Sequence, residues 1–331
     1  ILNHSMTLFA WIFFLLLVIA LLALDLGVFN KTNHEISTSE ALKMTLLWIV
    51  CALIFAGVLV VAYQHDWFEL LSSTSDSSIH NGYDAGLKYI TGYLIEKSLS
   101  LDNIFVMAML LSYFKIPRKY QHEVLFWGIV GALVFRGVMI ILGAALVNRF
   151  SWVMYVFGVL LIISALKMLF GKDDEFDADK SVVIKLIRKI YVVSPELDEG
   201  KFFTIQNGVR AMTPLLVVLL VIESTDIMFA VDSIPAIFSV TTDSFIVFTS
   251  NIFAILGLRS LYFVLSSLMS KFQYMKYSLF VLLVFIGVEM LLPAFVEVEI
   301  PILVSLSVIV VILGVGILVS ILTNKKSGVD E

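Results

Sequence analysis

The sequence predicts an all-α polytopic membrane protein, because its composition, its long apolar runs and an internal repeat each indicate this class. Of the 331 residues, 60% are hydrophobic and 15% are charged. Soluble domains are roughly 45–50% apolar, whereas the mean hydropathy of this chain is +1.00. One soluble globule cannot hide that much apolar surface, so lipid must solvate part of it.

Nine runs of the chain are apolar enough to form transmembrane helices, each of which needs about 20 residues. The first run can already span a membrane, so we expect no cleavable signal peptide. The opening ILNHS before Met6 is interpreted as an expression remnant. The runs lie at 7–29, 42–63, 87–114, 123–147, 151–170, 213–236, 244–269, 275–293 and 301–323.

The lysines and arginines between the runs predict the orientation of the chain. If successive runs alternate in direction, one side of the membrane receives sixteen of these residues and the other receives two, Lys88 and Arg149. The richer side is expected to be cytoplasmic under the positive-inside rule. In a bacterial inner membrane, the N-terminus would therefore lie outside and the C-terminus inside.

The runs divide the chain into five segments. Residues 1–86 hold two spans and a periplasmic loop, and residues 294–331 hold the ninth span and a cytoplasmic tail. Residues 87–170 and 213–293 hold three spans each, and 171–212 form a cytoplasmic loop between them.

The cytoplasmic loop is expected to contain a helix and a hairpin. Residues 180–192 read KSVVIKLIRKIYV, an amphipathic pattern. Such a helix could lie on the cytoplasmic leaflet or pack on the underside of the bundle, and both alternatives stay open. Asn207-Gly208 between two β-favouring runs predicts a type I′ hairpin. The apolar face of the helix consists of Val183, Leu186, Ile187 and Ile190.

The two three-span segments are predicted to be copies of one unit. The copies cover residues 88–170 and 213–292. Because each copy has an odd number of spans, the copies are expected to face opposite ways in the membrane. That is the inverted-repeat plan of secondary transporters, whose site lies near the midplane. The matches are EKSLSLDNI from Glu96 with DIMFAVDSI from Asp226, Arg136 with Arg259, and Tyr155–Leu169 with Tyr277–Leu291.

The apolar runs contain more acids than bases. A carboxylate at the bilayer centre costs about 2.5–3.5 kcal/mol on insertion scales, so the excess negative charge must be neutralised by protons or by a metal cation. The acids are Asp25, Glu96, Asp102, Glu223, Asp226, Asp232 and Glu289, and the bases are Lys97, Arg136, Lys167 and Arg259.

Helical geometry groups the polar residues of the third and sixth runs. At about 100° per residue, each run carries one polar stripe. These stripes contain Glu96, Ser100 and Asn103 in the third run and Glu223, Asp226 and Ser233 in the sixth.

Asp102 and Asp232 lie about 120° away from these stripes on unbroken helices. Either each helix unwinds near its motif, or each aspartate reaches toward the partner repeat. Pro235 follows Asp232 closely and would remove a helix hydrogen bond, so a break is expected in the sixth run. Whether the helix of the third run is also broken stays open.

The remaining polar residues are expected to support this site. Arg136 and Arg259 are interpreted as structural ion-pair partners of nearby acids. Asp25 lies near the cytoplasmic end of the first run, where a capping or rim role is as reasonable as metal binding.

Ligand chemistry favours a hard cation. Carboxylates, the Asn103 amide and the Ser233 hydroxyl offer oxygen atoms, which suit Mn²⁺, Mg²⁺ or Ca²⁺. No run has a histidine at its centre, which argues against zinc or copper. The only cysteine, Cys51, excludes a disulfide framework, a CxxC pair and an iron–sulfur cluster.

Four segments resemble the signature motifs of the TerC/Alx family, and the resemblance covers nearly the whole chain. It is closest to the Alx branch and shows no departure from the motifs. It implies membership of the lysine-exporter superfamily of inverted-repeat transporters. The segments are ALDLGVFNKTNHEIS at 23–37, EKSLSLDNI at 96–104, ESTDIMFAVDSIPAIF at 223–238 and NIFAILGLRSLYF at 251–263.

The resemblance also implies a function. The family is linked to manganese export and metal homeostasis, and Alx members are associated with an alkaline-pH response. They are also labelled redox modulators, which a chain with one cysteine and no cofactor motif does not support. By resemblance, the functional acids of this chain are Glu96, Asp102, Glu223, Asp226 and Asp232.

The resulting hypothesis is a membrane exporter of a divalent metal, with Mn²⁺ favoured as substrate and no permanently bound cofactor. Coupling of metal export to proton import is compatible with this hypothesis, because crowded carboxylates hold protons more tightly. The alternative is a non-transporting sensor or scaffold for pH or metal stress that acts through the 171–212 loop. Export of basic amino acids is a third hypothesis. Neither an enzyme nor a nucleic-acid partner is expected, since no nucleophile–base pair or phosphate loop is present.

Overall fold

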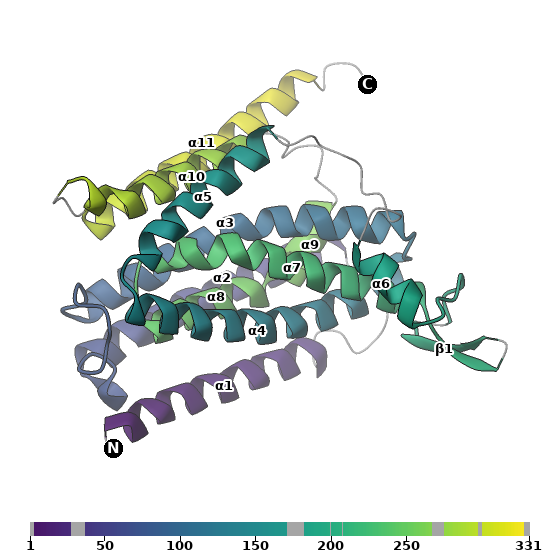
Figure 1. The fold of residues 1–331 in the computed structure, drawn as a ribbon, viewed down its shortest axis with the longest axis horizontal. Helices are drawn as coiled ribbons and strands as arrows, with labels where there is room; N and C mark the ends of the chain where they lie inside the picture. Colours follow the sequence, from purple (N-terminus) through teal and green to yellow (C-terminus); the bar gives the residue numbers. More distant parts are fainter. Residues whose placement is uncertain are drawn as a thin grey trace.

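The computed structural model describes residues 3–27, 37–170, 182–198, 200–206, 208–266, 275–296 and 300–327. These residues are mostly helical, and the long helices run side by side as a bundle (Figure 1). The predicted all-α polytopic class is confirmed. In chain order, the elements are α1 (Asn3–Gly27), α2 (Thr38–Gln64), η1 (Trp67–Glu69), α3 (Gly82–Tyr113), α4 (Arg118–Arg149), α5 (Val153–Phe170), α6 (Val182–Ile190), β1 (Phe203–Gln206), β2 (Val209–Met212), α7 (Pro214–Phe238), α8 (Ser244–Leu256), α9 (Leu258–Ser266), α10 (Met275–Leu291), η3 (Leu292–Ala294) and α11 (Ile302–Ser327).

Seven of the described helices are long and apolar enough to cross a membrane, and an eighth span results if α8 and α9 form one bent segment. With 32 residues, α3 is also long enough. Its charged residues, from Asp84 to Asp102, make it less apolar than the others. Counting α3 and the bent pair, the described helices match the nine predicted runs, while nine membrane crossings stay a prediction.

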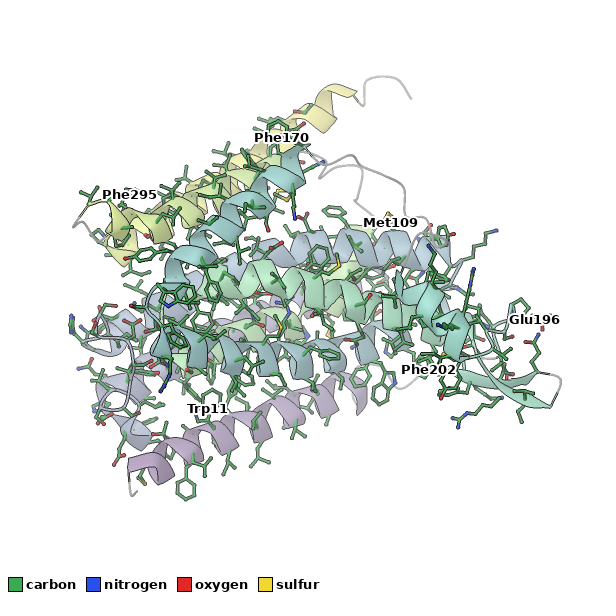
Figure 2. All side chains as sticks on the ribbon, in the orientation of Figure 1. Trp11, Met109, Phe170, Glu196, Phe202 and Phe295 are labelled. Atoms are coloured by element: carbon green, nitrogen blue, oxygen red, sulfur yellow. The ribbon has the colours of Figure 1, made fainter. Side chains whose placement is uncertain are left out.

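The outermost helices present apolar side chains to the surroundings. Phe13 of α1 is 61% exposed and Val311 of α11 is 62% exposed. Figure 2 shows Phe170 and Phe295 projecting from the outside of the bundle, whereas Trp11 points inward. Trp11 packs on the rings of Phe245 and Phe248. This distribution is typical of a bundle whose lateral surface contacts lipid.

The two three-helix segments pack in exchanged pairs. The first helix of each segment packs on the second helix of the other, α3 on α8 and α7 on α4, and the third helices α5 and α10 pack together. At the α5–α10 crossing, a Cβ added to Gly158 or Gly287 would lie 3.0 or 2.9 Å from the carbonyl oxygen of the other glycine. This reciprocal packing supports the internal repeat, which stays a prediction.

The break that the sequence predicted in the sixth run is wrong. Helix α7 continues through Pro235 to Phe238, because Pro235 lies in its last turn, where the loss of one hydrogen bond does not interrupt the segment. The break occurs instead in the seventh run, where α8 and α9 meet at Gly257 with a bend of 42°. Lys97 donates to the Ala254 carbonyl oxygen at 3.0 Å there, where the end of a helix favours positive charge.

The loop before α7 forms the expected helix and two paired strands at one end of the bundle (Figure 1). The predicted turn residue Asn207 lies outside the described residues. The predicted apolar face of α6 is confirmed for Ile187, which is buried, and for Val183, which packs against the bundle. It is wrong for Leu186 and Ile190, which are 56% and 64% exposed, and it missed Ile184, which is buried beside Ile187. Three-residue spacing brings the buried pair onto one face, so α6 packs on the end of the bundle.

At the opposite end, Asp76 fastens the loop between α2 and α3 to the turn between α7 and α8. Its Oδ2 accepts hydrogen bonds from Lys88 Nζ at 2.9 Å and from Thr241 Oγ1 at 2.6 Å. Its Oδ1 accepts one from Ser78 Oγ at 2.6 Å. Burial would raise the pKa of Asp76, but the bonds from Ser78 and Thr241 and the Lys88 ammonium lower it to about 2.

We therefore expect Asp76→Asn to lower the free energy of unfolding by on the order of 2 kcal/mol at neutral pH. The folded-state pKa is below the ordinary value of 3.8, so the ionised group stabilises the fold above that value. This contribution is lost as the pH falls through about 2. Thermal unfolding of the detergent-solubilised protein should show a constant difference from wild type between about pH 7 and 5 and a smaller one near pH 3. A difference that does not change with pH would contradict the assignment.

Candidate functional site

The polar centre of the bundle is organised around Arg136 of α4, whose side chain is fully buried. Its NH1 group forms an ion pair with Glu96 of α3. Its NH2 and Nε groups donate to the two carboxylate oxygens of Asp226 of α7 at 3.0 and 3.2 Å. One guanidinium therefore pairs with two buried carboxylates, one from each repeat, and we call these three residues the Arg136 network.

Small polar side chains complete the hydrogen bonds of this network. Asn103 donates to Asp226 at 3.2 Å, and Ser100 donates to Glu96 at 3.2 Å. Asn251 of α8 donates to the second oxygen of Glu96 at 2.9 Å and is fully buried. Sequence reasoning missed Asn251. The available signal was an amide in the middle of an otherwise apolar run.

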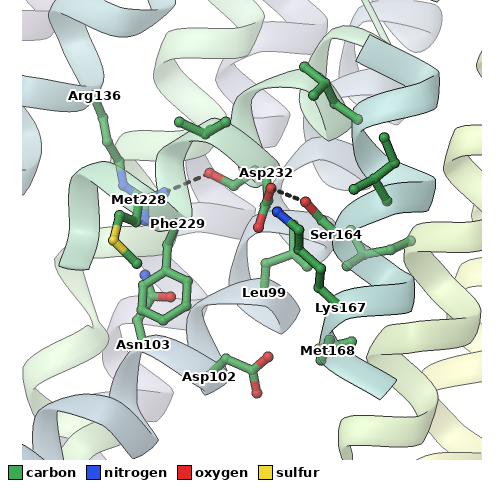
Figure 3. A pocket seen from close by; sticks show the side chains of 15 residues that line it. Leu99, Asp102, Asn103, Arg136, Ser164, Lys167, Met168, Met228, Phe229 and Asp232 are labelled. Atoms are coloured by element: carbon green, nitrogen blue, oxygen red, sulfur yellow. Dashed lines mark hydrogen bonds between the residues drawn. The ribbon is translucent and has the colours of Figure 1, made fainter. Parts of the chain in front are cut away.

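Asp102 and Asp232 turn away from the Arg136 network into a cavity of about 800 Å³, the Asp232 cavity. Of the two alternatives for Asp232, an unwound helix or a side chain directed at the partner repeat, the structure has the second. Asp232 of α7 accepts a hydrogen bond from Ser164 of α5 at 2.5 Å. Figure 3 shows the Lys167 side chain pointing toward Asp232, and Asp102 on another wall. The two equivalent aspartates of the repeats therefore line one cavity.

The Asp232 cavity touches the Arg136 network along one edge. Arg136, Asn103 and Ser233 belong to its lining, and Arg136 NH1 donates to Ser233 Oγ at 3.4 Å. Figure 3 shows the Arg136 guanidinium at the edge of the cavity. The cavity and the network therefore share Arg136 and its contact with Ser233, whereas the charged partner of Asp232 is Lys167.

Glu223 lies about one turn before Asp226 on α7 and interacts with its charge, but it has no ion pair with Arg136. Its carboxylate fills the space left by Gly131 of α4, where an added Cβ would lie 2.0 Å from Glu223 Oε1. Its Oε2 is buried without a hydrogen-bond partner among the described residues. An unsatisfied buried carboxylate oxygen is costly, so Glu223 is a group that favours a cation or a proton nearby.

The five predicted acids do not converge on one group, and their role as metal ligands stays a prediction. Within the described ranges, no three side chains of His, Cys, Asp or Glu are grouped as a metal site. The physical reason is that Arg136 holds Glu96 and Asp226, whereas the helical phase of Asp102 and Asp232 directs them to the neighbouring cavity.

The second repeat arginine forms its own ion pair. Arg259 NH2 contacts Asp25 Oδ1 at 2.6 Å, and both side chains are almost fully buried. Arg259 NH1 is also 3.1 Å from His122 Nε2. Asp25 is thus tied to α9 by an ion pair and is separate from the Asp232 cavity.

This fold and site define a multi-pass integral membrane protein with a buried arginine–carboxylate network at the contact of two helical segments. The chain belongs to the TerC family, because the model of the "Integral membrane protein TerC family" matches residues 81–328.

Curated relatives agree with this membership over nearly their whole length. The chain is 47% identical to "Uncharacterized membrane protein STKORF319" of Myxococcus xanthus, over 97% of this chain and 94% of that protein. It is 40% identical to the "Putative membrane-bound redox modulator Alx" of Salmonella typhi and 39% identical to that of Escherichia coli strain K12, each over 96% of this chain and 95% of the relative. No solved structure matches the chain.

Proposed function

We propose that this protein exports a divalent metal ion, Mn²⁺ in the first place, across the bacterial inner membrane. The observation that carries the proposal is the Asp232 cavity, where Asp102 and Asp232 from the two repeats line one space. A carboxylate in a membrane-spanning segment marks an ion pathway by default, because its cost must be balanced by function or by a partner.

The oxygen donors around the cavity support a cation as the substrate. Arg136 is already engaged by Glu96 and Asp226, and the two cavity aspartates interact with lysines instead, Asp232 with Lys167 and Asp102 with Lys276. An incoming cation would compete with these lysines for the carboxylates. The lining adds the Ser164 hydroxyl and the Asn103 amide, and such oxygen donors suit hard ions. Two carboxylates on separate walls favour an ion that keeps part of its hydration and leaves again.

The proposed direction of transport follows from the loop charges. The lining reaches Lys167 and Met168 near the end of α5, which precedes the 171–212 loop, and this loop has more basic residues than any other. With that end in the cytoplasm, the cavity receives the ion from inside the cell. Protons are the proposed counter-ion, because the same carboxylates bind either a proton or a metal.

Ion flux in sealed proteoliposomes tests the proposal. We expect the wild-type protein to carry Mn²⁺, and a pH gradient to change the rate. The Glu196→Gln variant, altered at an exposed position near the hairpin, should behave as wild type and serves as the matched control.

Two further outcomes identify the alternatives. Lysine or arginine flux without Mn²⁺ flux would assign the cavity to a basic amino acid. No flux of either kind from well-folded protein would overturn the export proposal and favour a sensor or scaffold that acts through the α6 end of the molecule.

A further inference from the structure

Two cavities, each with acidic side chains in its lining, lie in succession along the same helices. The Asp232 cavity is the first. The second, of about 740 Å³, lies between α3, the loop of Asp76 and the α10–α11 connection, and we call it the Glu289 cavity. Glu289 on its wall contacts Ser305 of α11. Neither the Arg136 network nor the proposed metal site explains this second cavity.

The residues of α3 that line the two cavities form one continuous stripe. Asp84, Lys88 and Ile95 line the Glu289 cavity, and Leu99 and Asp102 line the Asp232 cavity. The steps between them are four, seven, four and three residues, which keeps all five on one helical face. Ile95 and Leu99 occupy successive turns, about 6 Å apart along the axis.

Helices α7 and α10 repeat this arrangement. Asp232 lines the first cavity, and Val240, just after α7, lines the second. Ala236 lies four residues from each, on the same face. On α10, Leu283 lines the Asp232 cavity and Ile286 lines the Glu289 cavity.

A thin layer of apolar side chains separates the two cavities. Ile95, Ala236 and Ile286, one from each of the three helices, are all 0% exposed. They belong to one hydrophobic cluster. A hydrated cation cannot enter such a layer without losing water, and apolar constrictions of this kind close ion paths.

We propose that the ion path runs from the Asp232 cavity along the shared face of α3 to the Glu289 cavity, with Ile95, Ala236 and Ile286 as the closed barrier. This inference rests on the proposed export function and names its exit route. Because Gly158 and Gly287 bring α5 and α10 into close contact, we infer that these helices move as a pair. Such a movement would separate Ile286 from Ile95 and open the barrier.

Thiol labelling tests the barrier without requiring transport. On a Cys51→Ala chain, Ser164→Cys reports the Asp232 cavity and Ser239→Cys reports the Glu289 cavity. In oriented vesicles, a membrane-impermeant thiol reagent should label the first from the α6 side and the second from the opposite side. Labelling of both positions from the same side would overturn the proposal.

Passive Mn²⁺ leak provides the second readout. The Ile95→Ala/Ile286→Ala double variant should raise the leak in the absence of a driving gradient by about tenfold, because a wider constriction hydrates. Ile104→Ala is the matched control: Ile104 lies on α3 and is also 0% exposed, but it belongs to a different cluster. An unchanged leak in the double variant, or an equal leak in the control, would contradict the barrier.

The two tests separate this inference from the proposed function. If wild type carries no Mn²⁺ but the two cysteines are labelled from opposite sides, the export function fails and the barrier stands. If Mn²⁺ is transported but both cysteines are labelled from one side, the export function stands and this route is wrong.

Discussion

Replacing Arg136 with glutamine is expected to lower the free energy of unfolding by about 3–5 kcal/mol, since removal of one partner leaves buried charge uncompensated. Arg136 is 0% exposed and contacts two acids, Glu96 and Asp226. Glutamine keeps hydrogen-bonding capacity but supplies no positive charge. Thermal unfolding in detergent and the yield of folded protein from membranes measure the effect.

Removing the acids together with the arginine should restore much of this stability. We expect the Arg136→Gln/Glu96→Gln/Asp226→Asn chain to be more stable than Arg136→Gln alone, because neutral amides can be buried with hydrogen bonds and without a charge imbalance. Arg210→Gln, on the exposed hairpin, is the control for loss of an arginine. If the triple variant is no more stable than Arg136→Gln, the network does not act through charge compensation.

The same triple variant separates structure from transport. If Glu96 and Asp226 only balance Arg136, the restored protein should still carry Mn²⁺. If it is folded but transports nothing, the charged form of the network takes part in the transport cycle.

Sequence reasoning located most of the helices because a transmembrane segment can be recognised from a run of about 20 mostly apolar residues. The aligned arginines also pointed to ion pairs, since a buried guanidinium needs a carboxylate nearby. The structure places Arg136 with Glu96 and Asp226, and Arg259 with Asp25.

The parts that the sequence did not predict depend on tertiary contacts. Pro235 suggested a break, but the break occurs at Gly257, where Lys97 from another helix contacts the end of α8. The apolar pattern of α6 could not say which side chains meet the bundle, and Ile184 is buried while Leu186 is not.

The position of the two cavity aspartates also depends on tertiary contacts. Helical phase alone predicted that Asp102 and Asp232 diverge from the other acids, but not where they point. Their common cavity depends on how α5 packs against α7, which brings Ser164 to Asp232. Such a contact joins residues far apart in sequence, so no local sequence pattern predicts it.

Asp232→Asn is expected to lower the rate of Mn²⁺ transport by roughly tenfold or more, because each 1.4 kcal/mol of lost cation binding is about a factor of ten. The fold should change little. Asparagine can still accept the hydrogen bond from Ser164 Oγ, and the aspartate is half-buried on the wall of the cavity. Transport in proteoliposomes and thermal unfolding measure the two effects on the same preparation.

Lys167→Met gives the opposite electrostatic change at the same site. The Lys167 ammonium points toward Asp232 (Figure 3) and interacts with its charge. Its removal should therefore lower the Mn²⁺ concentration at half-maximal transport, whereas Asp232→Asn should raise it. Shifts of opposite sign cannot come from general misfolding, so they would assign the cavity to a cation. If both variants weaken Mn²⁺ transport equally while Glu196→Gln does not, Asp232 and Lys167 act as a structural pair and the cation binds elsewhere.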